Sequence, residues 1–115
     1  MIQDIFCKII AGEIKAETVY KDDEFWVIKD INPQAPIHLL VIPVKHFESI
    51  DDVHADDIGL LGKGLVIADK VAHDMGLGDR GYRLIINEGE DGGKIVPHLH
   101  IHLLGGKKLG PKIVK

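Results

Sequence analysis

Three of the seven histidines stand at alternate positions, as His98, His100 and His102. Side chains on a β-strand alternate between its two faces, so these three imidazoles would share one face while Leu99 and Ile101 share the other. A neutral imidazole is largely unprotonated near pH 7, and it can attack phosphorus when a neighbour fixes its tautomer. The spacing therefore predicts a strand with one face in the core and one face available for chemistry.

Two other interpretations of the histidine pattern remain open. One is a half-exposed strand that uses histidine as an ordinary polar residue. The other is a zinc site, for which His98 and His102 would lie about 13 Å apart along the strand, too far to share one ion. At most the neighbours His98 and His100 could bind a metal together, and Cys7 is the only cysteine. We therefore expect no metal and no cofactor, and we keep a metal site on His98 and His100 as the alternative.

A glycine-rich segment, residues 88–93 (EGEDGG), comes shortly before the histidines. The N–H groups of successive glycines can form a concave anion-binding site. The segment therefore predicts a phosphate-binding turn beside the histidine strand.

Length and composition limit the class of protein. The chain has 115 residues, 45% of them hydrophobic, which predicts a single folded domain over residues 1–115. The net charge of −4 argues against a general or sequence-specific nucleic-acid binder, which usually carries a basic surface. One cysteine cannot form an internal disulfide, and the apolar runs are too short to span a membrane. We expect a cytoplasmic protein without a signal peptide.

Periodicity and turn residues predict two helices and five strands. A short helix is expected over residues 4–11, with Asp4 as N-cap and Gly12 at its end, and a long one over residues 55–75. The strands are expected at residues 18–21, 24–30, 38–42, 82–87 and 96–104. Short loops between most of these elements favour an α+β fold with a mainly antiparallel sheet covered on one face.

Several segments together resemble a known family. Residues 98–104 (HLHIHLL) match the signature of the histidine triad superfamily, and residues 30–38 (DINPQAPIH) are similar to the second motif of its Hint branch, the histidine triad nucleotide-binding proteins. Residues 5–10, 87–93 and 103–106 also resemble that branch. The resemblance implies a histidine triad (HIT)-like fold and a homodimer whose two sheets join into one of ten strands.

The resemblance also implies an activity and the residues that perform it. The family's enzymes hydrolyse purine nucleoside phosphoramidates and aminoacyl-adenylates without a metal. By this likeness His100 would attack the α-phosphorus and form a nucleotidyl-histidine intermediate. The backbone carbonyl of His98 would hold the other nitrogen of His100, His102 would bond phosphate oxygens and help to protonate the departing amine, and His38 would support the triad.

The same resemblance assigns a nucleotide-binding site. Asp30 would accept hydrogen bonds from the ribose hydroxyls, and Asn87, Gly93 and the N–H groups of Ile95 and Val96 would position the phosphate. The base would lie in an apolar slot formed by Ile5, Phe6, Ile9, Ile28 and Ile31. The implied partners are a purine nucleoside monophosphate, its phosphoramidate conjugates and a second copy of the chain.

Three positions depart from the family pattern, which often has Gln, a small polar residue and an aromatic where this chain has Lys94, Ile95 and Pro97. Ile95 has no hydroxyl to donate to the scissile nitrogen. We therefore keep two alternative functions, a nucleotide-binding module with weak catalysis and a dinucleoside polyphosphate hydrolase. Lys94 is hypothesised to add a cation beside the phosphate. Three histidines match no motif and are expected at the surface rather than as ligands: His46, His54 and His73.

Overall fold

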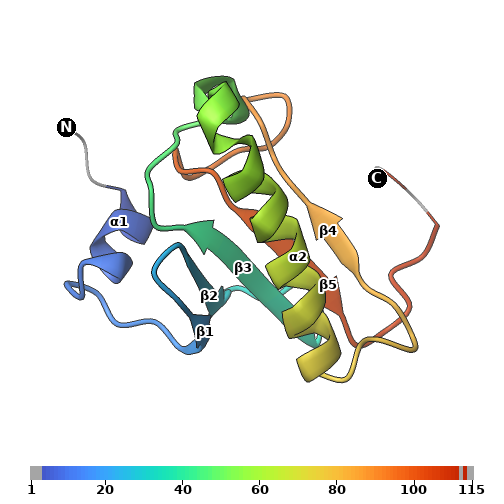
Figure 1. Ribbon diagram of the computed structural model, residues 1–115. Coiled ribbons are helices and arrows are strands. Elements are labelled where there is room, and N and C mark those ends of the chain that lie inside the picture. Colours follow the sequence, from blue (N-terminus) through green and yellow to red (C-terminus); the bar gives the residue numbers. More distant parts are fainter. Residues whose placement is uncertain (1–3, 112, 114–115) are drawn as a thin grey trace.

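The computed structural model describes residues 4–111 and 113 and contains one antiparallel sheet with a long and a short helix (Figure 1). The strand order is β1-β2-β3-β5-β4, and every neighbouring pair is antiparallel. The elements are α1 (Ile5–Ile10), β1 (Thr18–Lys21), β2 (Phe25–Lys29), β3 (Ile37–Pro43), α2 (Ile58–Asp74), β4 (Arg83–Ile85) and β5 (Ile101–Gly105). The expected α+β fold with five antiparallel strands is confirmed.

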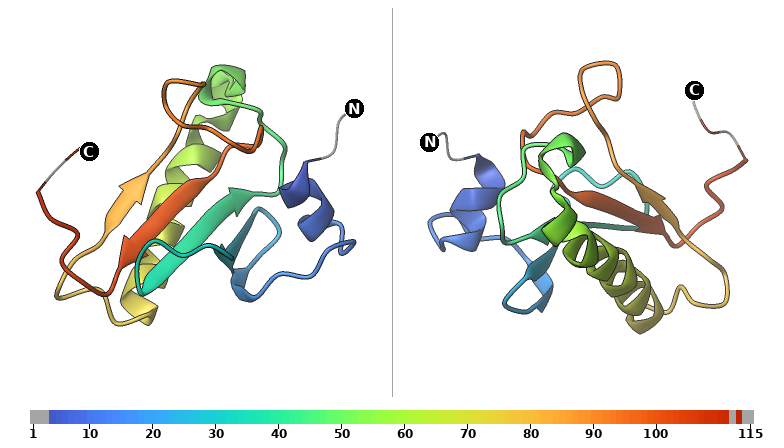
Figure 2. Two further views of the ribbon diagram at one scale, coloured as in Figure 1. Left: turned by 180° about the vertical axis from the view of Figure 1, so that it is seen from behind. Right: turned by 45° about the horizontal axis from the view of Figure 1, so that its top comes forward.

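Helix α2 lies along one face of the sheet, and in Figure 2 (left) it is seen behind the strands. Its buried residues, which include Ile67 and Val71, pack against the inward-facing side chains of the central strands, such as Val27, Leu39 and Leu103. These side chains stand at alternate positions, as expected for strands with one face in the core. This cluster forms the larger of two hydrophobic cores.

A second, smaller core lies on the opposite face of the sheet, where α1 packs. Phe6 and Ile9 of α1 contact the side chains that alternate with those of the first core, namely Ile28, Leu40 and Ile42. We expected the sheet to be covered on one face only, and that was wrong in this region. Alternation in β2 and β3 is interrupted because both of their faces are buried, which produces continuous apolar runs.

Capping residues set the ends of α1. Asp4 is the N-cap, and its Oδ1 accepts a hydrogen bond from the backbone N of Cys7 at 2.8 Å. Gly12 follows the C-cap with φ of 82°, a conformation that glycine adopts without strain. An isolated helix of six residues is unstable in water, so α1 depends on its contacts with the sheet.

The last strand begins later than expected. β5 starts at Ile101 rather than at position 96, so only His102 of the three histidines lies within it. The chain bends at 96–98, where the N–H of His98 donates to Val96 O at 2.8 Å and Pro97 has no N–H to give to a ladder. β4 is also shorter than expected, ending at Ile85 rather than at position 87.

Helix α2 begins at Ile58, after two short 3-10 helices (Ile50–Asp52 and Ala55–Asp57), rather than at position 55. One of its glycines is explained by packing, because a Cβ at Gly64 would lie 2.8 Å from the ring of Phe25. Gly59 and Gly62 face open space, and no contact explains them. None of the described helices combines the length and apolar character needed to cross a membrane.

Candidate active site

A pocket of about 480 Å³ lies between α1, the loop after β2 and the segment before β5. It brings together twelve of the fourteen site residues named from the sequence, and the other two, His38 and His98, do not line it. The twelve are Ile5, Phe6, Ile9, Ile28, Asp30, Ile31, Asn87, Gly93, Ile95, Val96, His100 and His102. Residues 14–16, Lys29, Asn32 and Leu40 also line the pocket and were not foreseen. Of these, Leu40 could have been found, because it alternates with the core residues Leu39 and Val41.

His100 is held in one tautomer by the backbone. Its Nδ1 lies 2.7 Å from the carbonyl oxygen of His98, and a carbonyl can only accept, so Nδ1 carries the proton. Nε2 then has a free lone pair on a ring that lines the pocket. Burial lowers the pKa of His100, although the bond to His98 opposes this, so the neutral form is favoured. The ring of Phe6 packs edge-on against it, with centroids 5.0 Å apart.

His102 is oriented by a chain of hydrogen bonds. The backbone N–H of Gln34 donates to Nδ1 of His38 at 3.0 Å, so Nε2 of His38 carries the proton and donates to Nδ1 of His102 at 2.9 Å. Nε2 of His102 is therefore a donor in the neutral ring. Burial, with His100 and His38 nearby, lowers the pKa of His102 to about 4.

Asp30 and Asn87 each combine a local contact with a position on the pocket wall. Oδ1 of Asp30 accepts from the backbone N of Asn32 at 2.8 Å, and its Oδ2 lies 3.3 Å from Nε2 of His38. Nδ2 of Asn87 donates to the carbonyl of Gly92 at 2.6 Å. Both residues thus stabilise their turns, and both also line the pocket.

One glycine of the expected anion-binding turn, Gly93, has its N–H occupied by a carbonyl within the turn. Gly93, with φ of 80°, donates to Glu90 O, and Lys94 donates its N–H to Gly89 O. The turn is therefore held by hydrogen bonds between its own backbone N–H and carbonyl groups. The next two N–H groups along the chain, those of Ile95 and Val96, have no partner within residues 4–111, and both residues line the pocket.

The side chain of Lys94 does not extend into this pocket. Its amine donates to the carbonyl of Glu48 and lies 3.5 Å from the carboxylate of Glu88. Lys94 therefore does not line the pocket, but its charge is near enough to contribute to the lowered pKa of His100, and its effect on a bound phosphate stays a prediction. Ile95 is 90% exposed at the rim of the pocket, where its side chain offers no polar atom.

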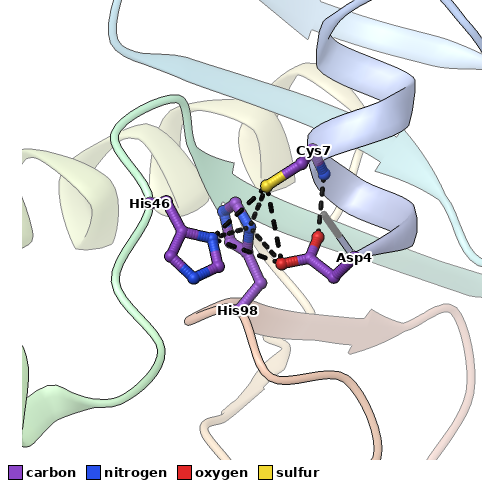
Figure 3. A group of neighbouring side chains, drawn as sticks. All are labelled: Asp4, Cys7, His46 and His98. Atoms are coloured by element: carbon purple, nitrogen blue, oxygen red, sulfur yellow. Dashed lines mark hydrogen bonds and ion pairs between the residues drawn. The ribbon is translucent and has the colours of Figure 1, made fainter. Parts of the chain in front are cut away.

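His98 is completely buried, does not line the pocket and points toward Asp4, Cys7 and His46 (Figure 3). Its Nε2 donates to Pro43 O at 3.0 Å, while its Nδ1 points to Asp4, Cys7 and His46. His46 is at the surface, as expected, yet it contacts His98 at 3.1 Å. No sequence signal indicated this contact, because the two residues are 52 positions apart. Within the described chain, no group of three or more possible metal ligands contains both His98 and His100, so the zinc alternative based on that pair gains no support.

A second pocket of about 480 Å³ adjoins the first and shares Asn87 and His102 with it. Its charged side chains are Arg83, Lys107 and Lys108, and His38 also lines it. The two pockets therefore meet at His102, whose imidazole centroid lies 5.0 Å from that of His100.

Comparison with known proteins agrees with this arrangement. The HIT domain model matches residues 11–109. An uncharacterized HIT-like protein of Chlamydia muridarum is 50% identical over 106 residues, which cover 92% of this chain and 83% of that protein. The purine nucleoside phosphoramidase of Escherichia coli K12 is 44% identical over 111 residues, covering 96% and 93%. A HIT family hydrolase from Clostridium thermocellum superposes with a TM-score of 0.94 at 43% identity, covering 99% of both chains.

Proposed function

Because the chain belongs to the HIT domain family, we propose that it is a nucleotide-binding hydrolase that cleaves the phosphorus–nitrogen bond of purine nucleoside 5′-phosphoramidates. The observation that carries this proposal is the tautomer of His100, whose Nδ1–H is bound by His98 O while Nε2 keeps its lone pair. The similarity to a purine nucleoside phosphoramidase supports the substrate class. Aminoacyl-adenylates have the same phosphorus with a carboxylate leaving group, and we include them.

The first displacement forms a covalent intermediate. The lone pair of His100 Nε2 attacks the α-phosphorus, a phosphorus–nitrogen bond to His100 forms, and the bond to the leaving group breaks with its electron pair. An anionic phosphoryl group beside His102 favours the protonated ring, because an opposite charge raises the pKa of a histidine. Nδ1 of His102 then also carries a proton, and Nε2–H of His38 donates instead to Oδ2 of Asp30, which lies 3.3 Å away. His102 then gives its Nε2 proton to the departing amine. A departing carboxylate needs no proton.

The second displacement releases the nucleotide. A water oxygen attacks the phosphorus of the nucleotidyl-histidine, and the bond to His100 breaks with the electron pair returning to Nε2. The proton of the water passes to Nε2 of His102 when an amine has left, and to solvent when a carboxylate has left and Nε2 of His102 still carries its proton. Both histidines regain their starting forms. The Nδ1–H bond to His98 O stabilises the positive charge that develops on His100 during each step.

The remaining pocket residues hold the nucleotide. The apolar side chains of Phe6, Ile9 and Ile28 would contact the base, and the carboxylate of Asp30 retains acceptor capacity for ribose hydroxyls. The N–H groups of Ile95 and Val96 would bind phosphate oxygens.

We also propose that the protein forms a homodimer. β4 is an edge strand that pairs only with β5 within residues 4–111, so its other edge can pair with a second copy. Sedimentation of the full chain tests this, with two copies per particle as the expected result and a monomer as the contradicting one.

The central experiment measures hydrolysis of adenosine 5′-phosphoramidate by the wild type, His100→Gln and His73→Gln. His73 is an exposed histidine and serves as the matched control. We expect His100→Gln to lose at least about 10³-fold in rate while it still binds AMP, since the nucleophile is lost but the pocket remains. Acid-quenched wild type should carry one added nucleotidyl group on His100.

The proposal fails if His100→Gln keeps wild-type turnover. AMP binding without turnover by the wild type would instead support the nucleotide-binding module, with Ile95 as the first residue to replace. Thermal unfolding of each variant shows whether the fold is retained, and His100→Asn provides a second variant if His100→Gln is not folded.

A further inference from the structure

The second pocket, which adjoins the nucleotide pocket at His102, lies on the face of the sheet opposite α2. Arg83 and Ile85 of β4 line it and flank Leu84, which packs against the core beneath α2. Ile85 pairs with His102 of β5, and residues 107–109 form the other wall. The pocket therefore lies between β4, β5 and the segment after β5.

Three cationic side chains line this pocket, and no described Asp or Glu does. Arg83 comes from β4, and Lys107 and Lys108 come from the segment after β5. Within residues 4–111, none of the three forms an ion pair with a carboxylate. The whole chain carries a net charge of −4, so the positive charge of this pocket is a local feature. A cavity lined by charges of one sign attracts a ligand of the opposite sign.

A hydrogen bond holds the segment after β5 beside β4. Nη2 of Arg83 donates to the backbone carbonyl of Gly110 at 2.5 Å. Because a guanidinium has five N–H donors, Arg83 keeps donors for a ligand as well. Lys107 and Lys108 are close to Gly110 in the sequence, so the bond keeps both of them near the guanidinium.

The rest of the lining is apolar or neutral. Ile85, Leu104 and Leu109 provide apolar surface, and Gln34 provides an amide. An amino acid offers matching groups, since it has a carboxylate for the cations and a side chain for the apolar surface. A simple inorganic anion would use the cations alone.

The proposed hydrolysis places its leaving group next to this pocket. In that reaction the Nε2 proton of His102 passes to the departing amine, so the amine lies against a ring that lines both pockets. A further cavity, beside Glu48 and Glu88, shares Ile95 with the nucleotide pocket but is lined by no histidine. The part of the leaving group beyond the nitrogen is therefore closest to the second pocket.

We infer that the second pocket binds the leaving group and favours one with a negative charge, an inference that rests on the proposed function. The charge is the carboxylate of an amino acid joined to phosphorus through its amine, or else a phosphate. With the amino acid, the phosphorus–nitrogen bond breaks and the nitrogen takes the proton of His102. With the phosphate, a phosphorus–oxygen bond breaks and the oxygen leaves with the electron pair. An aminoacyl-adenylate would bring an ammonium group to this pocket, so it should bind less tightly.

The test compares two matched substrates, the adenosine 5′-phosphoramidates of glycine and of glycinamide, with the full chain. The two substrates differ in one negative charge, which lies on the leaving group. We expect kcat/KM to be about tenfold higher for the glycine conjugate at low salt. Salt at about 1 M should reduce this preference, because the Debye length then falls to about 3 Å.

Charge variants of the segment after β5 show whether this pocket causes the preference. Lys107→Gln, Lys108→Gln should reduce the ratio of the two kcat/KM values to about two, and Lys107→Glu, Lys108→Glu should reverse the preference. The matched control is Lys21→Gln, Lys70→Gln, which removes the same charge from two exposed lysines that line neither pocket and should keep the wild-type ratio. A merely structural effect of the substitutions would lower both values equally and leave the ratio unchanged.

A third substrate, diadenosine triphosphate, distinguishes the two kinds of anion, because its leaving group ends in a phosphate. Turnover comparable with that of the glycine conjugate, and reduced in Lys107→Gln, Lys108→Gln, would identify phosphate as the preferred group. Turnover of the glycine conjugate without turnover of diadenosine triphosphate would identify the amino-acid carboxylate, which the apolar lining favours.

Three results would overturn the inference: equal kcat/KM for the two phosphoramidates, a preference for glycinamide, or a wild-type ratio in Lys107→Gln, Lys108→Gln. Failure of the proposed hydrolysis is a different result, the absence of turnover with all three substrates. Calorimetry of the two uncleaved phosphoramidates would then decide, and the inference requires the glycine conjugate to bind about tenfold more tightly. Equal dissociation constants would overturn it in that case as well.

Discussion

The protonation of His102 should make the folded protein sensitive to acid by a calculable amount. In the unfolded chain this histidine has its ordinary pKa of about 6.5, whereas burial beside His100 and His38 lowers it to about 4 in the folded state. The difference corresponds to about 3 kcal/mol, since each pH unit is worth about 1.4 kcal/mol. As the pH falls, His102 takes up its proton in the unfolded chain before it does so in the folded protein. The resulting loss in the free energy of unfolding is absent above pH 6.5, grows as the pH falls and is complete below pH 4.

Urea unfolding at pH 7 and at pH 4 measures this effect as the difference between wild type and His102→Gln. The wild type should lose about 3 kcal/mol more than the variant between the two pH values, because glutamine does not titrate. Carboxylates such as Asp22 and Asp57, whose pKa values are lowered in the folded state, also reduce stability in acid but do so equally in both proteins. His73→Gln should follow the wild type. Parallel curves for wild type and His102→Gln would refute the argument.

Three further predictions concern packing and the ribose contact. In α2, Gly62→Ala should stabilise the protein by about 0.5–1 kcal/mol because the position is open, whereas Gly64→Ala should destabilise it by about 1 kcal/mol because its Cβ meets the buried ring of Phe25; thermal unfolding measures both. Leu103→Ala should cost about 2–5 kcal/mol in urea unfolding, since the side chain is fully buried in the core beneath α2. Asp30→Asn should weaken binding of AMP about tenfold but leave binding of the dideoxy nucleotide unchanged in calorimetry, and equal losses would show that the carboxylate does not contact the ribose.

Much of the fold could be predicted from the chemistry of residues that are close together in the sequence. The cap at Asp4, the stop at Gly12 and the apolar, β-branched runs of β2 and β3 are determined by neighbouring residues, so they could be predicted. The start of β5 could not, because it depends on a bend at Pro97 and on the bond from Leu99 N to Phe47 O, a partner far away in the sequence.

The residues of the site could be predicted where they belong to motifs of the family. The motifs selected residues that now surround one pocket, including exposed ones such as Ile31 and Ile95 that no rule of burial would have chosen. The direction in which each side chain points could not be predicted from the sequence. Lys94 reaches Glu48 instead of the pocket, and His98 turns toward Asp4 and His46, because both arrangements depend on contacts between distant segments.

The two hydrophobic cores on opposite faces of the sheet have a consequence for motion. α1 contributes only to the smaller core, so its local unfolding leaves the packing of α2 against the sheet intact. Such partial opening requires less free energy than global unfolding, and amides in α1 should exchange with solvent before those of β3 and β5. Phe6 and Ile9 thus place one wall of the nucleotide pocket in a separate cooperative unit. A base bound against these side chains would suppress the local unfolding of α1, whereas in the empty pocket α1 would open more often.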